Sequence, residues 1–417
     1  MRINQRYVTA GLAVVILWML AIGIAPANAA KPVLPQYAAE KHMGVASCSN
    51  SLCHGSASER HTTPVLQNEY LIWQRQDAHS DAFATLTTPE ALAITRKLGL
   101  GDPVSEALCL DCHTDNPAPA QRGDKFLLSD GIGCEACHGG AENWLASHTA
   151  PETTHADNLA AGMYPTADPQ ARAALCQSCH VGHPKKPMRH KLLGAGHPPL
   201  LFELDTYTAN LPPHYQVDTD YKQRKPTYAH LDWWAQGQIS AAKATLRKLK
   251  LYGDQRYHGF PEFALYECDT CHHSIEPGRA LRSNFTGLPR LNDVHLRLVG
   301  TILAATDTAL FEDWQQTVAT LHKNPTNRAQ TIARLEQLLA AAQKLVSQPD
   351  FWQPNRTQGL KRILLNPQGP VYLADFDTAR QVVMALGALQ AQQINSSNNI
   401  NYNNLDDLYK AVSQRKT

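Results

Sequence analysis

Ten cysteines fall into five pairs, and a histidine follows the second cysteine of every pair. The pairs are CSNSLCH (48–54), CLDCH (109–113), CEACH (134–138), CQSCH (176–180) and CDTCH (268–272). In C-x-x-C-H, one turn of backbone puts two thiols where they can bond the vinyl groups of a porphyrin, and the imidazole can then bind the iron. With 19 histidines in 417 residues, chance does not explain five such motifs. The spacing predicts five covalently bound haem c groups.

Zinc sites and disulfides are the alternatives for such cysteine pairs. Neither requires a histidine directly after the second cysteine in every case. The first motif differs from the others, because four residues separate Cys48 from Cys53 and the two could close a small disulfide loop. That alternative would leave four haems. We expect five, because this motif keeps the Cys53–His54 dipeptide and no other cysteine remains to replace either thiol.

The motifs define the expected attachment and ligand residues. The cysteines expected to bind the haems are Cys48, Cys53, Cys109, Cys112, Cys134, Cys137, Cys176, Cys179, Cys268 and Cys271. The expected proximal iron ligands are His54, His113, His138, His180 and His272.

Two kinds of segment must position these residues. From 31 to about 228, prolines, glycines and polar runs separate short helical pieces, so we expect peptide wrapped around covalent haems. Apolar residues at three- and four-residue steps predict amphipathic helices over 229–250, 294–322, 327–348 and 375–394. The expected fold is mainly α with much irregular coil. Its expected divisions are a pentahaem cytochrome c domain (30–280), a C-terminal helical region (281–393), and a polar linker with a short terminal helix (394–417).

The N-terminus has the pattern of a secretory signal peptide over residues 1–29. Arg2 and Arg6 precede the apolar run from 8 to 25, and Ala27-Asn28-Ala29 forms a cleavage signal. We therefore expect a periplasmic protein with no stable membrane insertion, the alternative being an uncleaved tether. The formal net charge of +1 gives no indication of nucleic-acid binding.

Five longer stretches resemble exported multihaem cytochromes of the cytochrome c-554 and hydroxylamine oxidoreductase type. They are HMGVASCSNSLCHG (42–55), NEYLIWQRQDAHSDAFATL (68–86), GIGCEACHGGAENWLASH (131–148), MRHKLLGAGHPPLLFEL (188–204) and PEFALYECDTCHH (261–273). The resemblance spans roughly residues 40 to 280. It implies that the distal iron ligands include His79, His148, His190 and His197, with His42 as the fifth. The pattern over 68–86 predicts one amphipathic helix that carries His79. His273, Met43, Met163 and Met188 are alternative ligands.

The expected function is single-electron transfer between redox partner proteins, one donor and one acceptor. Paired imidazoles tend to give haems low potentials, and neighbouring haems offer a path for electrons. The alternative is an oxidoreductase in which one haem keeps an open position for a small nitrogen or sulfur compound. His214, His230 and His258, with Tyr215 or Tyr257, would then be acid–base groups. A third possibility is a quinol dehydrogenase tethered by an uncleaved leader.

Overall fold

A computed structural model describes residues 32–60, 65–252, 262–272, 289–323, 328–366 and 375–394. The chain divides into two compact units, Met1–Val33 and Leu34–Thr417. The first lies almost wholly outside the described residues, and everything below concerns the second. The predicted leader, the segment after 394 and the predicted boundary at 280 also fall outside the described residues.

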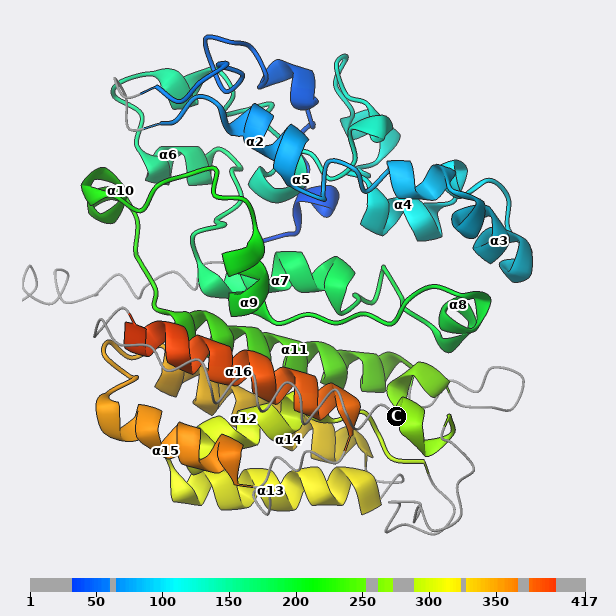
Figure 1. Ribbon diagram of the computed structural model, residues 1–417, viewed down its shortest axis with the longest axis vertical. Coiled ribbons are helices and arrows are strands. Elements are labelled where there is room, and N and C mark those ends of the chain that lie inside the picture. The colour runs from blue at the N-terminus through cyan, green and yellow to red at the C-terminus, as the bar shows by residue number, and fades with distance from the viewer. Residues whose placement is uncertain are drawn as a thin grey trace, which may run out of the picture. The chain divides into compact units, whose positions relative to one another are not determined.

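Residues 34–228 form short helices joined by long stretches of coil (Figure 1). Among the described residues there is no β-strand, which confirms the prediction of a mainly α fold with irregular coil. We call this part the haem lobe. Its helices are α2 (Glu69–Gln76), α3 (Pro89–Leu98), α4 (Ala107–His113), α5 (Cys134–His138), α6 (His155–Ala160), α7 (Pro169–His180), α8 (His190–Ala195), α9 (Leu204–Asn210) and α10 (Thr219–Arg224).

Longer helices gather into a second part, which we call the bundle (Figure 1). They are α11 (His230–Tyr252), α12 (Val294–Ala304), α13 (Thr308–Lys323), α14 (Arg328–Val346), α15 (Pro354–Leu365) and α16 (Phe376–Ile394). The predicted helix over 294–322 is two helices, because Asp307 accepts a hydrogen bond from the Leu310 N–H at 2.9 Å and starts α13. Helix α15 was not predicted. Within the described residues, no helix is long and apolar enough to span a membrane.

Apolar burial is concentrated in the bundle. Its main cluster draws only on residues between 231 and 389, and it includes the fully buried side chains Trp234, Trp314 and Leu298. In the haem lobe, the apolar cluster of buried residues consists of Ala173, Phe202 and Leu204. The hydrophobic effect therefore explains the stability of the bundle far better than that of the lobe.

Helix α11 joins the two parts, because α7 and α9 of the haem lobe both pack against it. The Gln177 side chain, inside the fourth motif, donates a 2.8 Å hydrogen bond to the Gly237 carbonyl oxygen in α11. A Cβ atom added at Gly237 would lie 2.6 Å from the Leu204 Cβ. Glycine at 237 thus permits the close approach of α9 and helps α11 to hold the fourth motif.

A buried ion-pair network ties the fifth motif to the bundle. The Arg297 guanidinium, with 8% of its side chain exposed, lies 2.6 Å from Asp293 and 2.7 Å from Asp375. It also pairs with Glu267, the residue directly before Cys268. The Glu267 N–H donates to the Arg290 carbonyl oxygen at 2.9 Å, so backbone and side chain both hold this position. The network therefore anchors the start of the fifth motif to α12 and α16.

Replacing Gly237 by alanine should lower the stability of the protein, because the new methyl group would overlap Leu204. The expected cost is about 1–3 kcal/mol, typical of overpacking a core. Gly387→Ala in α16 is the matched control, since nothing lies within 4 Å of the position that its new Cβ would take, and a helix gains about 0.5–1 kcal/mol from this change. Denaturant unfolding followed by circular dichroism measures both. Equal effects in the same direction would contradict the packing argument.

Arg297→Leu should destabilise the protein by about 3–5 kcal/mol, because it removes the mostly buried cation that joins three carboxylates. Glu267 and Asp293 would keep Arg290 and His322 as partners, whereas Asp375 would lose its cation. The control is Arg334→Leu, which breaks the Arg334–Asp313 pair, whose side chains are 51% and 36% exposed. Exposed pairs contribute at most about 1 kcal/mol. Unfolding midpoints of the two variants should differ clearly. Similar midpoints would show that the Arg297 network contributes no more than a surface pair.

Candidate haem-binding sites

Three of the five motifs form the end of a helix. Helices α4, α5 and α7 each end at the motif histidine, so the two cysteines lie one turn apart on one face and the histidine lies beside them. The fifth motif begins as a 3₁₀ turn, Cys268–Thr270, and the His272 N–H donates to the Cys268 carbonyl oxygen at 2.8 Å. Local helical geometry therefore brings both thiols and the imidazole of these motifs to the same side.

The first motif closes in the same way despite its two extra residues. The His54 N–H donates to the Cys48 carbonyl oxygen at 3.2 Å, as the His272 N–H does to Cys268. The extra residues form an exposed loop, in which the Asn50 side chain accepts the Leu52 N–H at 2.8 Å. The neighbouring Cys134 thiol lowers the pKa of Cys48. The longer loop thus leaves the backbone relation between first cysteine and histidine intact.

Each motif histidine faces the ring of a second histidine from a distant part of the chain. We number the sites after the motifs, 1 to 5. The ring centroids lie 6.2 Å apart for His54–His148 (site 1), 6.3 Å for His113–His197 (site 2), 6.3 Å for His138–His214 (site 3), 6.0 Å for His79–His180 (site 4) and 6.0 Å for His190–His272 (site 5).

These separations fit one iron between two imidazoles. A metal–nitrogen bond of about 2 Å on each side, plus the distance from nitrogen to ring centre, gives roughly 6 Å between centroids. In the described part of the chain, no group of three or more His, Cys, Asp or Glu side chains could hold a metal ion by itself. A porphyrin supplies the four further nitrogen ligands that each pair of rings would need.

The orientation of the rings also fits ligation through Nε2. Among the ten paired histidines, every hydrogen bond that a ring makes in the described structure uses Nδ1. The partners of Nδ1 are Glu69 for His54, Asp77 for His79, Thr85 and the Ala82 carbonyl oxygen for His113, and backbone carbonyl oxygens for His148, His197 and His214. Fixing Nδ1 in this way directs Nε2 toward the opposite ring.

Partial burial favours the neutral form of several motif histidines, which is the form that binds a metal. Burial lowers the pKa of His138 to about 3, and the neighbouring cations Lys225 and Arg172 contribute to the decrease. The pKa values of His113 and His180 are also lowered, mainly by burial. At His54 the hydrogen bond to Glu69 raises the pKa, which makes the imidazole more basic.

His42, expected as a distal ligand, lies in a different environment. Its side chain is fully buried, and both ring nitrogens have protein partners: Nδ1 lies 2.6 Å from Asp115 and Nε2 lies 3.3 Å from the Pro35 carbonyl oxygen. Burial lowers the pKa of His42, but the hydrogen bond and charge of Asp115 outweigh this and raise it overall. The ring therefore forms a buried ion pair with Asp115, and Phe126 packs against its edge.

The ring that faces His138 is instead His214, which the sequence suggested only as an acid–base group. The sequence around His214 shares one feature with that around the predicted ligand His197, because each histidine adjoins a pair of prolines. His214 follows Pro212 and Pro213, and His197 precedes its two prolines. Prolines fix the direction of the backbone at both rings. His79 also differs from expectation in its setting. Helix α2 ends at Gln76, and Asp77 accepts the His79 N–H at 3.0 Å, so His79 lies in a turn.

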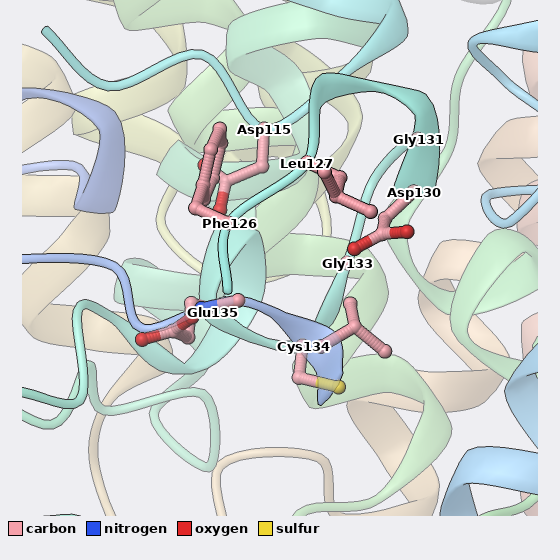
Figure 2. A pocket seen from close by; sticks show the side chains of 10 residues that line it. Asp115, Phe126, Leu127, Asp130, Gly131, Gly133, Cys134 and Glu135 are labelled. Carbon is pink, nitrogen blue, oxygen red and sulfur yellow. Dashed lines mark hydrogen bonds between the residues drawn. The ribbon is translucent and has the colours of Figure 1, made fainter. Parts of the chain in front are cut away.

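Glu135, inside the third motif, connects sites 1 and 3. It is 3% exposed, and its carboxylate accepts backbone N–H groups from Met43 (2.7 Å), Gly44 (2.7 Å) and Ala141 (2.8 Å). Burial raises its pKa, while these hydrogen bonds lower it. Figure 2 shows Glu135 and Cys134 at the lining of a small cavity. The residue thus holds the chain ahead of the first motif against the third.

Cysteines of different motifs also lie close together. Cys48 of site 1 and Cys134 of site 3 are close enough to shift each other's pKa, and so are Cys112 of site 2 and Cys179 of site 4. The Cys179 sulfur also lies 3.8 Å from the Asp111 carbonyl oxygen inside the second motif. The Lys186 ammonium lies 3.4 Å from the Cys179 sulfur. Sites 1 and 3 are therefore neighbours, and so are sites 2 and 4.

Comparison with known proteins supports one family. Residues 47–139, which contain the first three motifs, match the family described as cytochrome c554 and c-prime. No curated protein and no solved structure matches the chain. The match supports a c-type cytochrome role in electron transfer and implies covalently bound haem c. The motifs and this match together support a multihaem c-type cytochrome of the cytochrome c554 and c-prime family.

Proposed function

We propose that this chain is an exported electron carrier with five haem c groups, each ligated by two histidines. The observation that carries the proposal is the set of five ring pairs, because each motif histidine has its own partner at a distance of 6.0 to 6.3 Å between centroids. Bound haem c supplies a reversible one-electron iron couple. The proposed distal ligands are His148, His197, His214, His79 and His190, for sites 1 to 5 in that order.

The contacts between sites support a continuous order 1, 3, 4, 2, 5. Glu135 of the third motif accepts the Met43 and Gly44 N–H groups ahead of the first motif, which connects site 1 to 3. The Cys179 sulfur of site 4 lies 3.8 Å from the Asp111 carbonyl oxygen inside the second motif, which connects site 4 to 2. The Ile132 N–H, two residues before Cys134 of site 3, donates to the carbonyl oxygen of His79 of site 4 at 2.9 Å, which relates site 3 to 4. Helix α8 begins at His190 of site 5 and ends two residues before His197 of site 2. A helix of this length spans about 9 Å, so sites 2 and 5 are near neighbours.

The ends of this order are the sites that reach the surface. Cys53 of site 1 is exposed, as are Cys268 and Cys271 of site 5, whereas the attachment cysteines of sites 2, 3 and 4 are only partly exposed. Redox partner proteins would therefore meet the carrier at sites 1 and 5. The oxidoreductase alternative needs an open iron position, and a second ring faces every motif histidine. His230, one of its suggested acid–base groups, pairs instead with Asp205 at 3.0 Å.

Substitution of His214 and His42 tests the ligand assignment. His214→Ala should give one high-spin haem that binds carbon monoxide when reduced, because site 3 loses a ligand. His42→Ala should keep all haems low-spin, because His42 pairs with Asp115. Electron paramagnetic resonance of the oxidised proteins and carbon monoxide difference spectra measure both. The opposite pattern, or carbon monoxide binding by the wild type, would contradict the proposal.

The first motif can be tested separately by mass spectrometry. A proteolytic peptide that contains residues 48–54 should carry the mass of one haem, because the His54 N–H and Cys48 carbonyl keep the geometry of the shorter motifs. The peptide with CLDCH (109–113) is the control. A free 48–54 peptide, together with four haems in the intact protein, would exclude site 1.

A further inference from the structure

We propose that Glu69 and Asp77 lower the reduction potentials of sites 1 and 4, because each ionised carboxylate accepts the Nδ1 hydrogen bond of one ligand histidine. The inference rests on the proposed function, since it requires iron between the paired rings. Both carboxylates act through a histidine and so are positioning residues. The sites differ in the group that accepts the hydrogen bond from the Nδ1 of each ligand histidine.

At site 1, Glu69 holds the motif histidine. Its Oε2 lies 3.0 Å from His54 Nδ1, and its Oε1 accepts the Gln67 N–H at 3.1 Å. The Glu69 side chain is 16% exposed, so water screens the interaction only in part. The next residue, Tyr70, donates its N–H to the His54 carbonyl oxygen at 2.9 Å. The first turn of α2 thus fixes both the ring and the backbone of His54.

At site 4, Asp77 holds the opposite ligand in the same way. Its Oδ1 accepts from His79 Nδ1 at 2.9 Å and from the His79 N–H at 3.0 Å, and its side chain is 13% exposed. Asp77 is the residue that ends α2, whose first residue is Glu69. The Trp73 indole N–H donates to the Ile132 carbonyl oxygen at 3.0 Å, which fixes α2 against the chain ahead of the third motif. The first residue of α2 and the residue directly after its end therefore each present a carboxylate to one of the two sites.

The other ring hydrogen bonds have neutral acceptors. At site 2, His113 Nδ1 lies 2.9 Å from the Thr85 hydroxyl oxygen and 3.1 Å from the Ala82 carbonyl oxygen. On the opposite side, His197 Nδ1 lies 2.8 Å from the Pro198 carbonyl oxygen. At site 3, the acceptor for His214 is the Pro212 carbonyl oxygen at 3.4 Å. Among the ring hydrogen bonds that the ten paired histidines make in the described structure, ionised acceptors occur only at sites 1 and 4.

A carboxylate on Nδ1 changes the iron through the imidazole. Both side chains are ionised at neutral pH, and a charged acceptor strengthens the hydrogen bond and raises the basicity of the ligand nitrogen. A more basic ligand and a nearby negative charge both favour ferric over ferrous iron, because the ferric state carries one more positive charge. Hydrogen bonding to an axial ligand is one of the means by which a protein sets haem potential.

The consequence concerns the profile of potentials along the order 1, 3, 4, 2, 5. Sites 1 and 4 alternate with sites whose ring acceptors are neutral. Site 3 lies between the two, and the acceptor for its His214 is the neutral Pro212 carbonyl oxygen. Site 3 should therefore hold electrons more readily than either neighbour.

Glu69→Gln and Asp77→Asn test the inference, because each removes the charge and keeps the shape and an acceptor oxygen. Spectropotentiometric titration of the five-haem protein should show one midpoint raised in each variant, a different one in each, and both raised in the double variant. Thr85→Val is the matched control at site 2, where the neutral acceptor Ala82 O remains, and it should shift its haem much less. Unchanged midpoints in Glu69→Gln and Asp77→Asn, or an equal shift in Thr85→Val, would overturn the inference.

The same samples separate this inference from the proposed function. Haem content and electron paramagnetic resonance of the wild type report five low-spin haems if the function is as proposed. Five low-spin haems with unmoved midpoints would overturn the role of Glu69 and Asp77 alone. Fewer haems, or a high-spin signal in the wild type, would overturn the five ligand pairs themselves. The two carboxylates lie at separate sites, so each variant tests the inference even where the other one fails to fold.

Discussion

The separation of about 6 Å between paired imidazole rings is the constraint on which the haem lobe depends. Each pair joins segments that are distant in the sequence, such as His54 with His148 and His79 with His180. The pairs interleave along the chain, so no motif can be placed without fixing several others. On the proposed ligation, iron would connect these segments where a globular domain uses a continuous apolar core.

The distribution of buried apolar residues explains why such connections are needed. The bundle buries large side chains such as Trp234 and Leu298, whereas the apolar cluster of the lobe contains only Ala173, Phe202 and Leu204. Short helices are marginal in water without tertiary contacts. Hydrogen bonds made by buried polar side chains, such as Glu135 and Gln177, supply part of the tertiary contacts that the lobe lacks in apolar residues. Binding of the cofactor and folding of the lobe are then coupled, as in other metal-dependent domains.

The sequence was sufficient for the features that depend on local pattern. The motifs, the mainly α fold and helix α11 follow from spacing and periodicity. The partner of each motif histidine depends on tertiary contacts, and nearness in sequence was misleading there: His42, six residues before Cys48, contacts Asp115, whereas His214 faces His138 from a distant segment of the chain. Periodicity predicts a helix that includes His79, because the pattern of apolar residues carries no information on the hydrogen bonds of Asp77 that end α2.

The bundle takes part in building the sites and is more than an appended domain. Gly237 in α11 accepts the hydrogen bond of Gln177, a residue between the two cysteines of site 4. Arg297 in α12 pairs with Glu267, directly before the first cysteine of site 5. Glu262, at the start of the same segment, accepts the N–H of His190, the opposite ring of site 5, at 2.8 Å. A rigid apolar core thus sets the positions of sites 4 and 5, and sites 1, 2 and 3 take theirs from the lobe. On the proposed order of sites, a folded bundle is therefore needed to keep site 5 aligned with site 2.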